Sequence, residues 1–266
     1  MPLSFTILGC GSSGGVPRVG QGWGACDPKN PKNRRRRCSL LVEKTAGARR
    51  TLVLVDTSPD LREQLLGAEI SRLDGVIFTH EHADHTHGID DLRPLAIVQR
   101  QRIDTFLDAR TSEFLHRRFG YCFKTPVGSD YPPILHDHRI EAGKPVKIDG
   151  EGGAIEVLPI EHTHGNASAL GLRFGGLAYS PDVSGFPHNS LEALQGLDVW
   201  IIDALRLRPH PSHFTVEEAL AWIVRLRPRR AVLTNLHTDL DYETLRRALP
   251  PHVEPAYDGM RIEANE

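Results

Sequence analysis

The stretch Thr79–His85 reads Thr-His-Glu-His-Ala-Asp-His and follows the apolar run Val76–Thr79, which we expect to be a buried strand. Four of its side chains are of metal-ligating type: His80, His82, Asp84 and His85. Imidazole and carboxylate groups suit cations such as zinc, manganese or iron. The two-residue spacing lets His80 and His82 hold one ion, while Asp84 and His85 reach a second. Four ligand-type residues within six positions favour a metal site over a polar loop with structural histidines.

Two ions need more ligands than this cluster supplies, so further ligands are expected at other strand ends. Three positions qualify: His164 after the expected strand Ile155–Pro159, Asp182 after Leu177–Ser180, and His237 after Ala231–Asn235. The residues alone leave His162 and His164 as alternatives. They also leave open that Asp182 only caps a turn.

Length and composition exclude several classes of protein. The 266 residues, 39% of them hydrophobic, are enough for a sizeable core, and we expect residues 1–266 to form a single domain. A net charge of −2 argues against a protein that holds duplex DNA. We find no apolar run of the about 20 residues that a membrane helix needs, and the start does not resemble a signal peptide. Four scattered cysteines favour the cytoplasm.

Short β-type runs alternate with helical patterns, which predicts an α/β fold. The expected strands that are not yet named are Ser4–Leu8, Ser39–Glu43, Thr51–Asp56, Ala169–Phe174 and Val199–Asp203, and a short helix is expected at Asp60–Leu66. The clearest helix is Val216–Leu226. Thr215 and Glu218 have the spacing of a capping box at its start, and Pro228 follows its end.

The His-x-His-x-Asp-His run, with His, Asp and His following in that order, resembles the metallo-β-lactamase superfamily of two-metal hydrolases. The resemblance covers nearly the whole chain. It implies a four-layer αββα sandwich, in which two mixed β-sheets pack face to face with helices outside. It also implies two divalent ions, zinc or manganese. His80, His82 and His164 would hold one ion, Asp84, His85 and His237 the other, and Asp182 would bridge them. The family pattern favours His164 over His162.

A second element narrows the resemblance to the phosphodiesterase branch, which includes RNase Z. His213 stands in Pro211-Ser212-His213-Phe214-Thr215, just before the capped helix, where backbone N–H groups favour an anion. Relatives in this branch have a similar His-x-Thr element whose histidine contacts the scissile phosphate or protonates the leaving oxygen. His213 is therefore an expected catalytic residue. Asp84, from the metal-ligating run, is the other. A histidine that only closes the helix end is the alternative. Asp203, at the end of the expected strand Val199–Asp203, could orient His213 or a metal ligand, or could equally be a strand-end carboxylate without such a role.

The segment Gly9-Cys10-Gly11-Ser12-Ser13-Gly14-Gly15 matches a dinucleotide-binding pattern, but Gly15, Val16 and Pro17 leave no helix after it. It is instead similar to the Gly/Ser loop that opens phosphodiesterase-branch members and continues with Gly-Val-Pro-Arg. Ser12 and Ser13 are the expected substrate-binding residues here, together with His213.

Three segments resemble phosphoribosyl 1,2-cyclic phosphate phosphodiesterases: Gly9–Arg18, the Arg-rich run before Ser39-Leu40-Leu41-Val42, and Asn235-Leu236-His237. There is one departure. Those enzymes can carry an accessory zinc held by clustered cysteines and by a histidine three residues after the last ligand. This chain has only Cys26 in that region and Leu240 at the later position, so we expect no accessory zinc.

The expected activity is hydrolysis of a small cyclic or nucleotide-like ribose phosphodiester, with no DNA or membrane partner. The alternatives are an RNA 3′-end endonuclease of the RNase Z type and a metal-binding sensor without turnover. We see no long basic arm of the kind that grips tRNA. A homodimer is possible. Arg34–Arg37 could bind substrate phosphates, but a solvated basic loop is the favoured expectation. His136 and His138 are expected to be surface residues of a Pro-rich loop.

Overall fold

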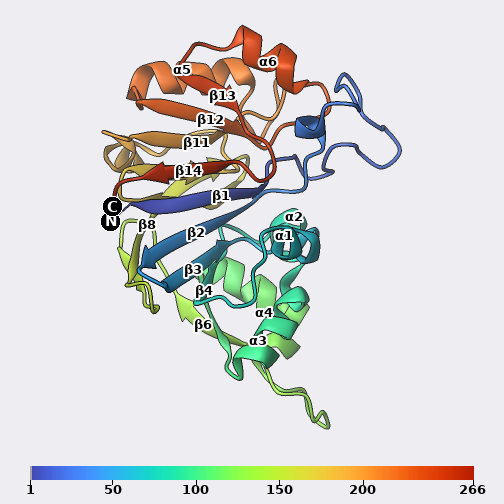
Figure 1. Ribbon diagram of the computed structural model, residues 1–266, viewed down its shortest axis with the longest axis vertical. Helices are drawn as coiled ribbons and strands as arrows, with labels where there is room; N and C mark the ends of the chain where they lie inside the picture. The colour runs from blue at the N-terminus through green and yellow to red at the C-terminus, as the bar shows by residue number, and fades with distance from the viewer. Residues whose placement is uncertain (1) are drawn as a thin grey trace.

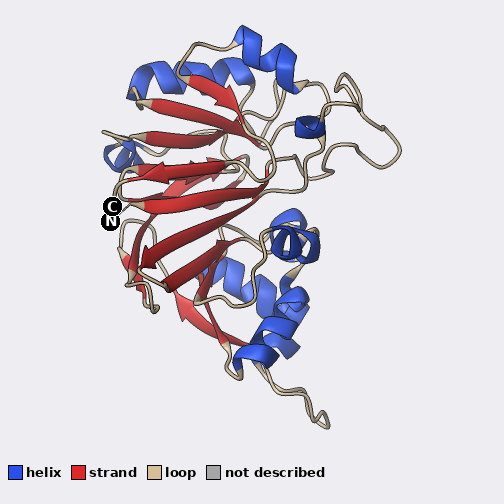
Figure 2. Ribbon diagram, in the orientation of Figure 1, coloured by secondary structure: helices blue, strands red, loops and turns tan. Residues whose placement is uncertain are grey.

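The computed structural model describes residues 2–266 and contains two seven-stranded sheets (Figures 1 and 2). The strands of the first sheet are β1 (Leu3–Gly9), β2 (Ser39–Ala46), β3 (Arg49–Val55), β4 (Gly75–Ile77), β5 (Ile103–Leu107), β6 (Leu135–Arg139) and β14 (Arg261–Ala264). Those of the second are β7 (Val146–Ile148), β8 (Ile155–His164), β9 (Ala167–Phe174), β10 (Leu177–Ser180), β11 (Val199–Asp203), β12 (Arg230–Thr234) and β13 (Val253–Pro255).

Helices connect and cover these strands. The α-helices are α1 (Leu61–Gly67), α2 (Ala83–Thr86), α3 (Arg93–Gln99), α4 (Ala109–Phe123), α5 (Val216–Leu226) and α6 (Tyr242–Ala248). Four short 3₁₀ turns are η1 (Pro31–Asn33), η2 (Ile89–Leu92), η3 (His188–Ser190) and η4 (Glu192–Leu194). No helix in residues 2–266 is long and apolar enough to cross a membrane.

Both sheets are mixed. The first has the order β14-β1-β2-β3-β4-β5-β6, antiparallel up to β3 and parallel from β3 to β6. The second has the order β13-β12-β11-β10-β9-β8-β7, parallel from β13 to β10 and antiparallel from there to β7. In each sheet the parallel strands alternate with helices, and their carboxyl ends lead into loops that carry the chemistry.

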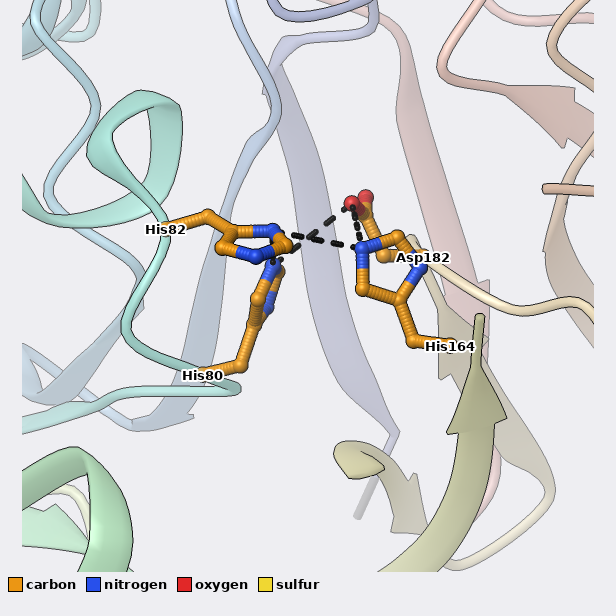
Figure 3. A group of neighbouring side chains, drawn as sticks. All are labelled: His80, His82, His164 and Asp182. Atoms are coloured by element: carbon orange, nitrogen blue, oxygen red, sulfur yellow. Dashed lines mark hydrogen bonds and ion pairs between the residues drawn. The ribbon is translucent and has the colours of Figure 1, made fainter. Parts of the chain in front are cut away.

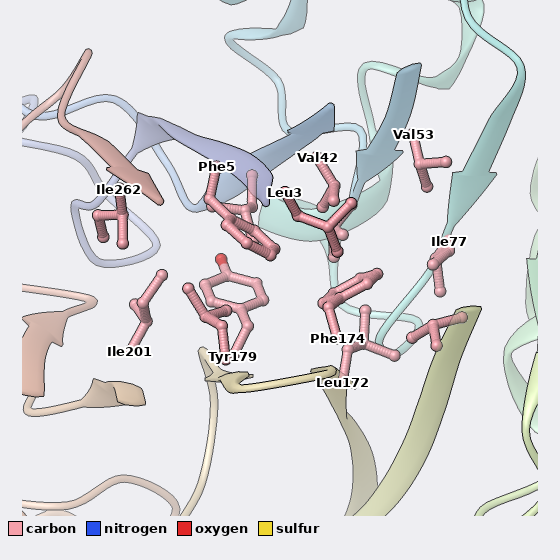
Figure 4. Packing of buried hydrophobic residues seen from close by; sticks show 14 of the residues in the cluster. Leu3, Phe5, Val42, Val53, Ile77, Leu172, Phe174, Tyr179, Ile201 and Ile262 are labelled. Atoms are coloured by element: carbon pink, nitrogen blue, oxygen red, sulfur yellow. The ribbon is translucent and has the colours of Figure 1, made fainter. Parts of the chain in front are cut away.

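Three hydrophobic clusters separate four layers. Alternation along each strand sends one set of side chains between the sheets and the other toward helices. In β3, Val53 and Val55 face the central cluster, whereas Leu52 and Leu54 face α1 and η2. In β11, Ile201 faces the central cluster (Figure 4), while its neighbour Trp200 joins the layer beneath α5. The expected four-layer αββα sandwich is confirmed.

The expected elements lie where the sequence placed them, with one difference that matters for the site. Leu177–Ser180, Val199–Asp203 and Val216–Leu226 have the predicted bounds, and Thr215 and Glu218 form the predicted capping box. However, β8 continues five residues past Pro159 and ends at His164. Pairing with β9 carries the strand onward, since His164 lies opposite Ala167.

Candidate metal centre

The loop after β4 is held by a buried carboxylate that the sequence analysis missed. Asp56 follows β3 with a φ of 62°. It accepts hydrogen bonds from the Thr79 backbone N–H (2.8 Å), from Thr79 Oγ1 (2.8 Å) and from Nδ1 of His85 (2.7 Å). Burial raises the pKa of Asp56, and the ion pair with His85 opposes that rise. An aspartate at the end of the neighbouring parallel strand was the signal that could have identified it.

His80, His82, His164 and Asp182 form one cluster, with their polar atoms turned toward one another (Figure 3). Nδ1 of His82 lies 3.0 Å from Nε2 of His80 and 3.2 Å from Nε2 of His164. Oδ2 of Asp182 lies 3.6 Å from each of those Nε2 atoms. These residues come from the loops after β4 and β10 and from the end of β8, so the fold joins segments about a hundred residues apart.

Hydrogen bonds behind the cluster fix which nitrogen each histidine presents. Nδ1 of His164 donates to the Ser212 carbonyl (2.7 Å), and Nδ1 of His80 donates to Thr79 Oγ1 (3.0 Å). Both Nε2 atoms therefore present lone pairs to the centre. Since Nδ1 of His82 carries at most one proton, it can donate to only one of them. The remaining lone-pair contact is unfavourable without a cation, so these donors fit a metal ion.

The separations support the same conclusion. Zinc–nitrogen bonds of about 2.0–2.1 Å in a tetrahedral site put ligand atoms roughly 3.3 Å apart. The four distances from Nδ1 of His82 and Oδ2 of Asp182 to the two Nε2 atoms are 3.0–3.6 Å, and all the ligand atoms of the cluster lie within 4.8 Å of one another.

Asp182 faces a second group of side chains with its other oxygen. Oδ1 lies 3.2 Å from Nε2 of His85, and that nitrogen lies 3.6 Å from Oδ2 of Asp84. Nδ1 of His85 donates to Asp56, and its buried Nε2 has no hydrogen-bond partner within residues 2–266. Two carboxylate oxygens that serve two separate groups of donors are what a bridging ligand requires. The structure thus brings Asp84, His85 and Asp182 together.

His237 is the one expected ligand whose ring contacts lie outside this group. Its Nε2 accepts from the Arg18 guanidinium (2.5 Å), and its Nδ1 is 3.0 Å from Asp239 Oδ1. Arg18 passes directly over Gly14, where an added Cβ would lie 2.3 Å from Arg18 Nε. The loop after β12 nevertheless adjoins the Gly/Ser loop, since the Leu236 N–H donates to the Cys10 carbonyl (2.8 Å).

His213 lies beside the cluster on the segment before α5. Its Nδ1 donates to Oδ2 of Asp203 (2.8 Å), and its Nε2 is 3.9 Å from Oδ2 of Asp182. Burial opposes protonation, but the Asp203 carboxylate raises the pKa of His213 to about 9. Burial raises the pKa of Asp203 itself to about 7. Of the alternatives that the sequence left for Asp203, the geometry therefore favours contact with His213.

Asn235 is a further residue that the sequence analysis missed. Its Nδ2 donates to Asp182 Oδ1 (3.3 Å) and to Asp203 Oδ1 (3.2 Å), so one amide connects the two carboxylates. Its φ of 61° is a conformation that asparagine tolerates better than most residues. An asparagine at the end of an expected strand, where the chain turns, was the signal in the sequence that could have identified Asn235.

His162 lies outside the cluster although it shares a strand face with His164. Its Nε2 is 3.4 Å from Ser180 Oγ, and its ring packs edge-on against Phe186. Burial lowers the pKa of His162 to about 3. The geometry therefore brings His164, and not His162, to the other candidate ligands.

The two serines of the Gly/Ser loop differ. Ser12 is buried, and its Oγ has no hydrogen-bond partner among the described residues, whereas Ser13 is exposed. The Ser12 N–H donates to the Leu236 carbonyl (3.3 Å). The loop thus adjoins the segment that carries His237.

The expectation of a solvated loop at Arg34–Arg37 is wrong for its second residue. Arg35 is 2% exposed. It donates to the carbonyls of Leu240 (2.7 Å) and His237 (3.3 Å) and to Asn33 Oδ1 (3.2 Å). Two ion pairs also fix this loop to the rest of the fold: Arg36 pairs with Asp258, and Arg37 pairs with Asp60. Arg34 alone is exposed.

Comparison with known proteins agrees with this geometry. A family model described as "Beta-lactamase superfamily domain" matches residues 51–235. The crystal structure of "a New Diphosphatase from the PhnP Family" is 34% identical, covers 99% of this chain and 98% of that one, and superposes with a TM-score of 0.88. Human tRNase Z, short form, is 16% identical with a TM-score of 0.62, covering 97% of this chain and 98% of that one.

A curated relative from Porphyromonas gingivalis bears the name octanoyltransferase. It is 34% identical over 98% of this chain, but the chain spans only about half (51%) of its length.

The chain belongs to the metallo-β-lactamase superfamily. Within it, the 34% identical diphosphatase relative belongs to the PhnP family, and the fold and His/Asp cluster of this chain are those of a metal-dependent hydrolase.

Proposed function

We propose that this protein hydrolyses a small cyclic or nucleotide-like ribose phosphodiester with two divalent ions, zinc or manganese. The observation that carries the proposal is the position of His213, whose Nε2 lies 3.9 Å from the carboxylate shared by the two groups of candidate ligands. Such a group can serve chemistry at the centre without being needed to hold a metal. The 34% identical PhnP-family relative, titled a diphosphatase, supports a phosphate ester or anhydride as substrate.

His80, His82 and His164 would hold one ion, Asp84, His85 and His237 the other, with Asp182 between them. When bound, such ions lower the pKa of water and neutralise phosphate charge. For His237 to serve as a ligand, its Nε2 has to leave Arg18. The freed guanidinium would then stand beside the metal centre, available to an anionic substrate.

The chain's own groups supply proton transfer and orientation. Asp203 accepts from Nδ1 of His213, which leaves Nε2 to donate a proton to the departing oxygen or to stabilise its charge. Asp84 is the second catalytic residue of the proposal, with its carboxylate partly exposed beside His85. Ser12 and Ser13 would approach the substrate from the Gly/Ser loop.

The test compares His213→Ala with His210→Ala. His210 is a partly exposed neighbour of His213, and the centroids of the two rings are 5.0 Å apart. The substrates are a 1,2-cyclic phosphoribose and a nucleoside diphosphate ester. We expect kcat to fall about 100-fold or more in His213→Ala with bound metal unchanged, because general acids contribute about 10²–10⁴-fold. His210→Ala should change kcat little.

Other outcomes would overturn parts of the proposal. Loss of metal in His213→Ala would make His213 a ligand. Cleavage of a tRNA 3′ end in place of the small esters would favour the RNase Z alternative, and no turnover with ions bound would favour the sensor.

The proposal also covers the cellular location and the oligomeric state of the protein. All four cysteines are free and buried, which supports a reducing, cytoplasmic location. No DNA or membrane partner is proposed. Sedimentation equilibrium tests the possible homodimer.

A further inference from the structure

A second group of ligand-type side chains lies on the edge of the first sheet. Asp104 is on β5, and His136 and His138 are on β6, the last strand of that sheet. The sequence analysis placed these histidines in a Pro-rich loop, which is wrong: they belong to a strand. The parallel register sets Asp104 opposite His136. Since side chains alternate along a strand, His136 and His138 project from the same face as Asp104.

The three side chains converge on one oxygen. Oδ1 of Asp104 lies 2.8 Å from Nε2 of His138 and 3.2 Å from Nδ1 of His136. One ligand atom from each residue lies within 4.8 Å of the other two. Tetrahedral zinc needs ligand atoms roughly 3.3 Å apart. The ion could therefore be accommodated by small rotations of the side chains.

The backbone and a neighbouring ring hold this arrangement in place. Phe106, one step along the same face of β5, stacks on the His138 ring at 5.0 Å between centroids with planes 17° apart. The His136 ring meets the His138 ring edge-on at 4.5 Å. The side chains of Asp104, His136 and His138 are 47%, 60% and 37% exposed, so a cation can reach them from solvent.

The donor set determines which cation fits. Two imidazoles and one carboxylate suit zinc and similar divalent metals, and they match the preferences of calcium or magnesium poorly. Three protein ligands leave a fourth position for water or an external ligand.

We propose that Asp104, His136 and His138 form an additional binding site for a zinc-class divalent cation. The site is separate from the metal centre, since it is built on β5 and β6 and uses none of the loops after β4, β10 and β12. A bound ion would join the edge strand β6 to β5 by ligand bonds as well as by the sheet hydrogen bonds. The competing interpretation is a pair of simple His–Asp hydrogen bonds that take up no metal.

The experiment counts zinc per chain in the purified full-length protein. Wild type and His136→Ala/His138→Ala are dialysed against chelator-buffered zinc, and bound metal is measured by mass spectrometry. The control is His116→Ala. His116 is another exposed histidine, on α4, and it pairs with Asp137, which lies on β6 between His136 and His138. We expect the double variant to bind one equivalent less than wild type, and the control to bind as much as wild type.

The count is read as a difference, so it does not depend on how many ions the metal centre holds. Equal zinc content in wild type and double variant would overturn the proposal. So would an equal loss in the His116→Ala control, because that would indicate non-specific binding to surface histidines. Anomalous scattering at the zinc edge then locates the ion. Density at β5 and β6 is expected, and zinc at any other surface position with none there would refute the assignment.

Discussion

Replacing Arg35 by methionine removes a buried guanidinium that connects the loop before β2 to the segment carrying His237. Methionine preserves much of the volume and removes the donors. In the native structure Arg35 donates to the Leu240 carbonyl at 2.7 Å and, over longer distances, to the His237 carbonyl and Asn33. Two of these acceptors keep another donor, since the Leu240 N–H reaches the His237 carbonyl and the Tyr242 N–H reaches Asn33.

The expected loss of stability depends on which of these acceptors are left without a donor. The Leu240 carbonyl depends most on Arg35, its other polar contact being the weak Cys26 thiol donor at 3.5 Å. An unsatisfied buried acceptor costs about 1–3 kcal/mol, and hydrogen bonds from a charged donor contribute about 1.5–3 kcal/mol. Relief from burying the guanidinium offsets part of this. We therefore expect Arg35→Met to lower the free energy of unfolding by about 2–4 kcal/mol.

The assay is urea denaturation followed by circular dichroism, with Arg34→Met as the matched control. Arg34 is exposed, and its guanidinium lies 5.6 Å from the centre of the Trp23 ring, so its loss should cost within about 0.5 kcal/mol. An unchanged or increased stability of Arg35→Met would refute the reasoning, because the cost of burying the charge would then exceed the gain from its hydrogen bonds.

Three further predictions concern the ligand choice and two local contacts. His164→Ala should reduce the amount of bound metal, whereas His162→Ala should leave it unchanged. Mass spectrometry of the purified variants measures the bound metal. Equal metal content in the two variants would remove His164 from the set of ligands. Gly171→Ala should destabilise the fold by about 1–3 kcal/mol through overpacking, since its Cβ would lie 2.0 Å from His162 Cε1. Thermal denaturation measures this, and an unshifted midpoint would contradict it. Asp241→Ala should cost about 1 kcal/mol through the lost cap of α6 at the Thr244 N–H (3.0 Å), and more in total, because the same carboxylate accepts from Asn33 Nδ2 (2.6 Å) and from the Asp27 N–H (3.1 Å). The same denaturation assay applies, with no loss of stability as the contradicting result.

The layers and most candidate ligands could be predicted because they depend on local pattern. Period-two alternation marks the strands, strand ends place His80 and Asp182 next to turns, and the capping box places His213 just before α5. The four-layer sandwich followed from the resemblance that those motifs carried. These signals are short-range, so they survive without knowledge of the pairing between distant segments.

The supporting contacts could not be predicted because they depend on long-range pairing. Arg35 is buried only because the segment around residues 237–240 folds over it, some two hundred positions away. The strand β8 reaches His164 because β9 pairs with it, whereas composition alone ended the strand at Pro159. Likewise, His136 and His138 follow prolines in a polar stretch, and only pairing with β5 makes that stretch a strand.

The pairing of β14 with β1 brings the two ends of the described chain to one corner of the molecule (Figure 1), since Leu3 lies opposite Ala264. The other end of β1 leads into the Gly/Ser loop. Seven residues of strand, roughly 23 Å at 3.3 Å per residue, therefore separate that corner from the Gly/Ser loop. A surface linker or fluorophore attached at either end would thus be anchored at the same place and directed away from incoming substrate. The same proximity makes the fold a good scaffold for circular permutation, with Leu3 and Ala264 connected by a short tether.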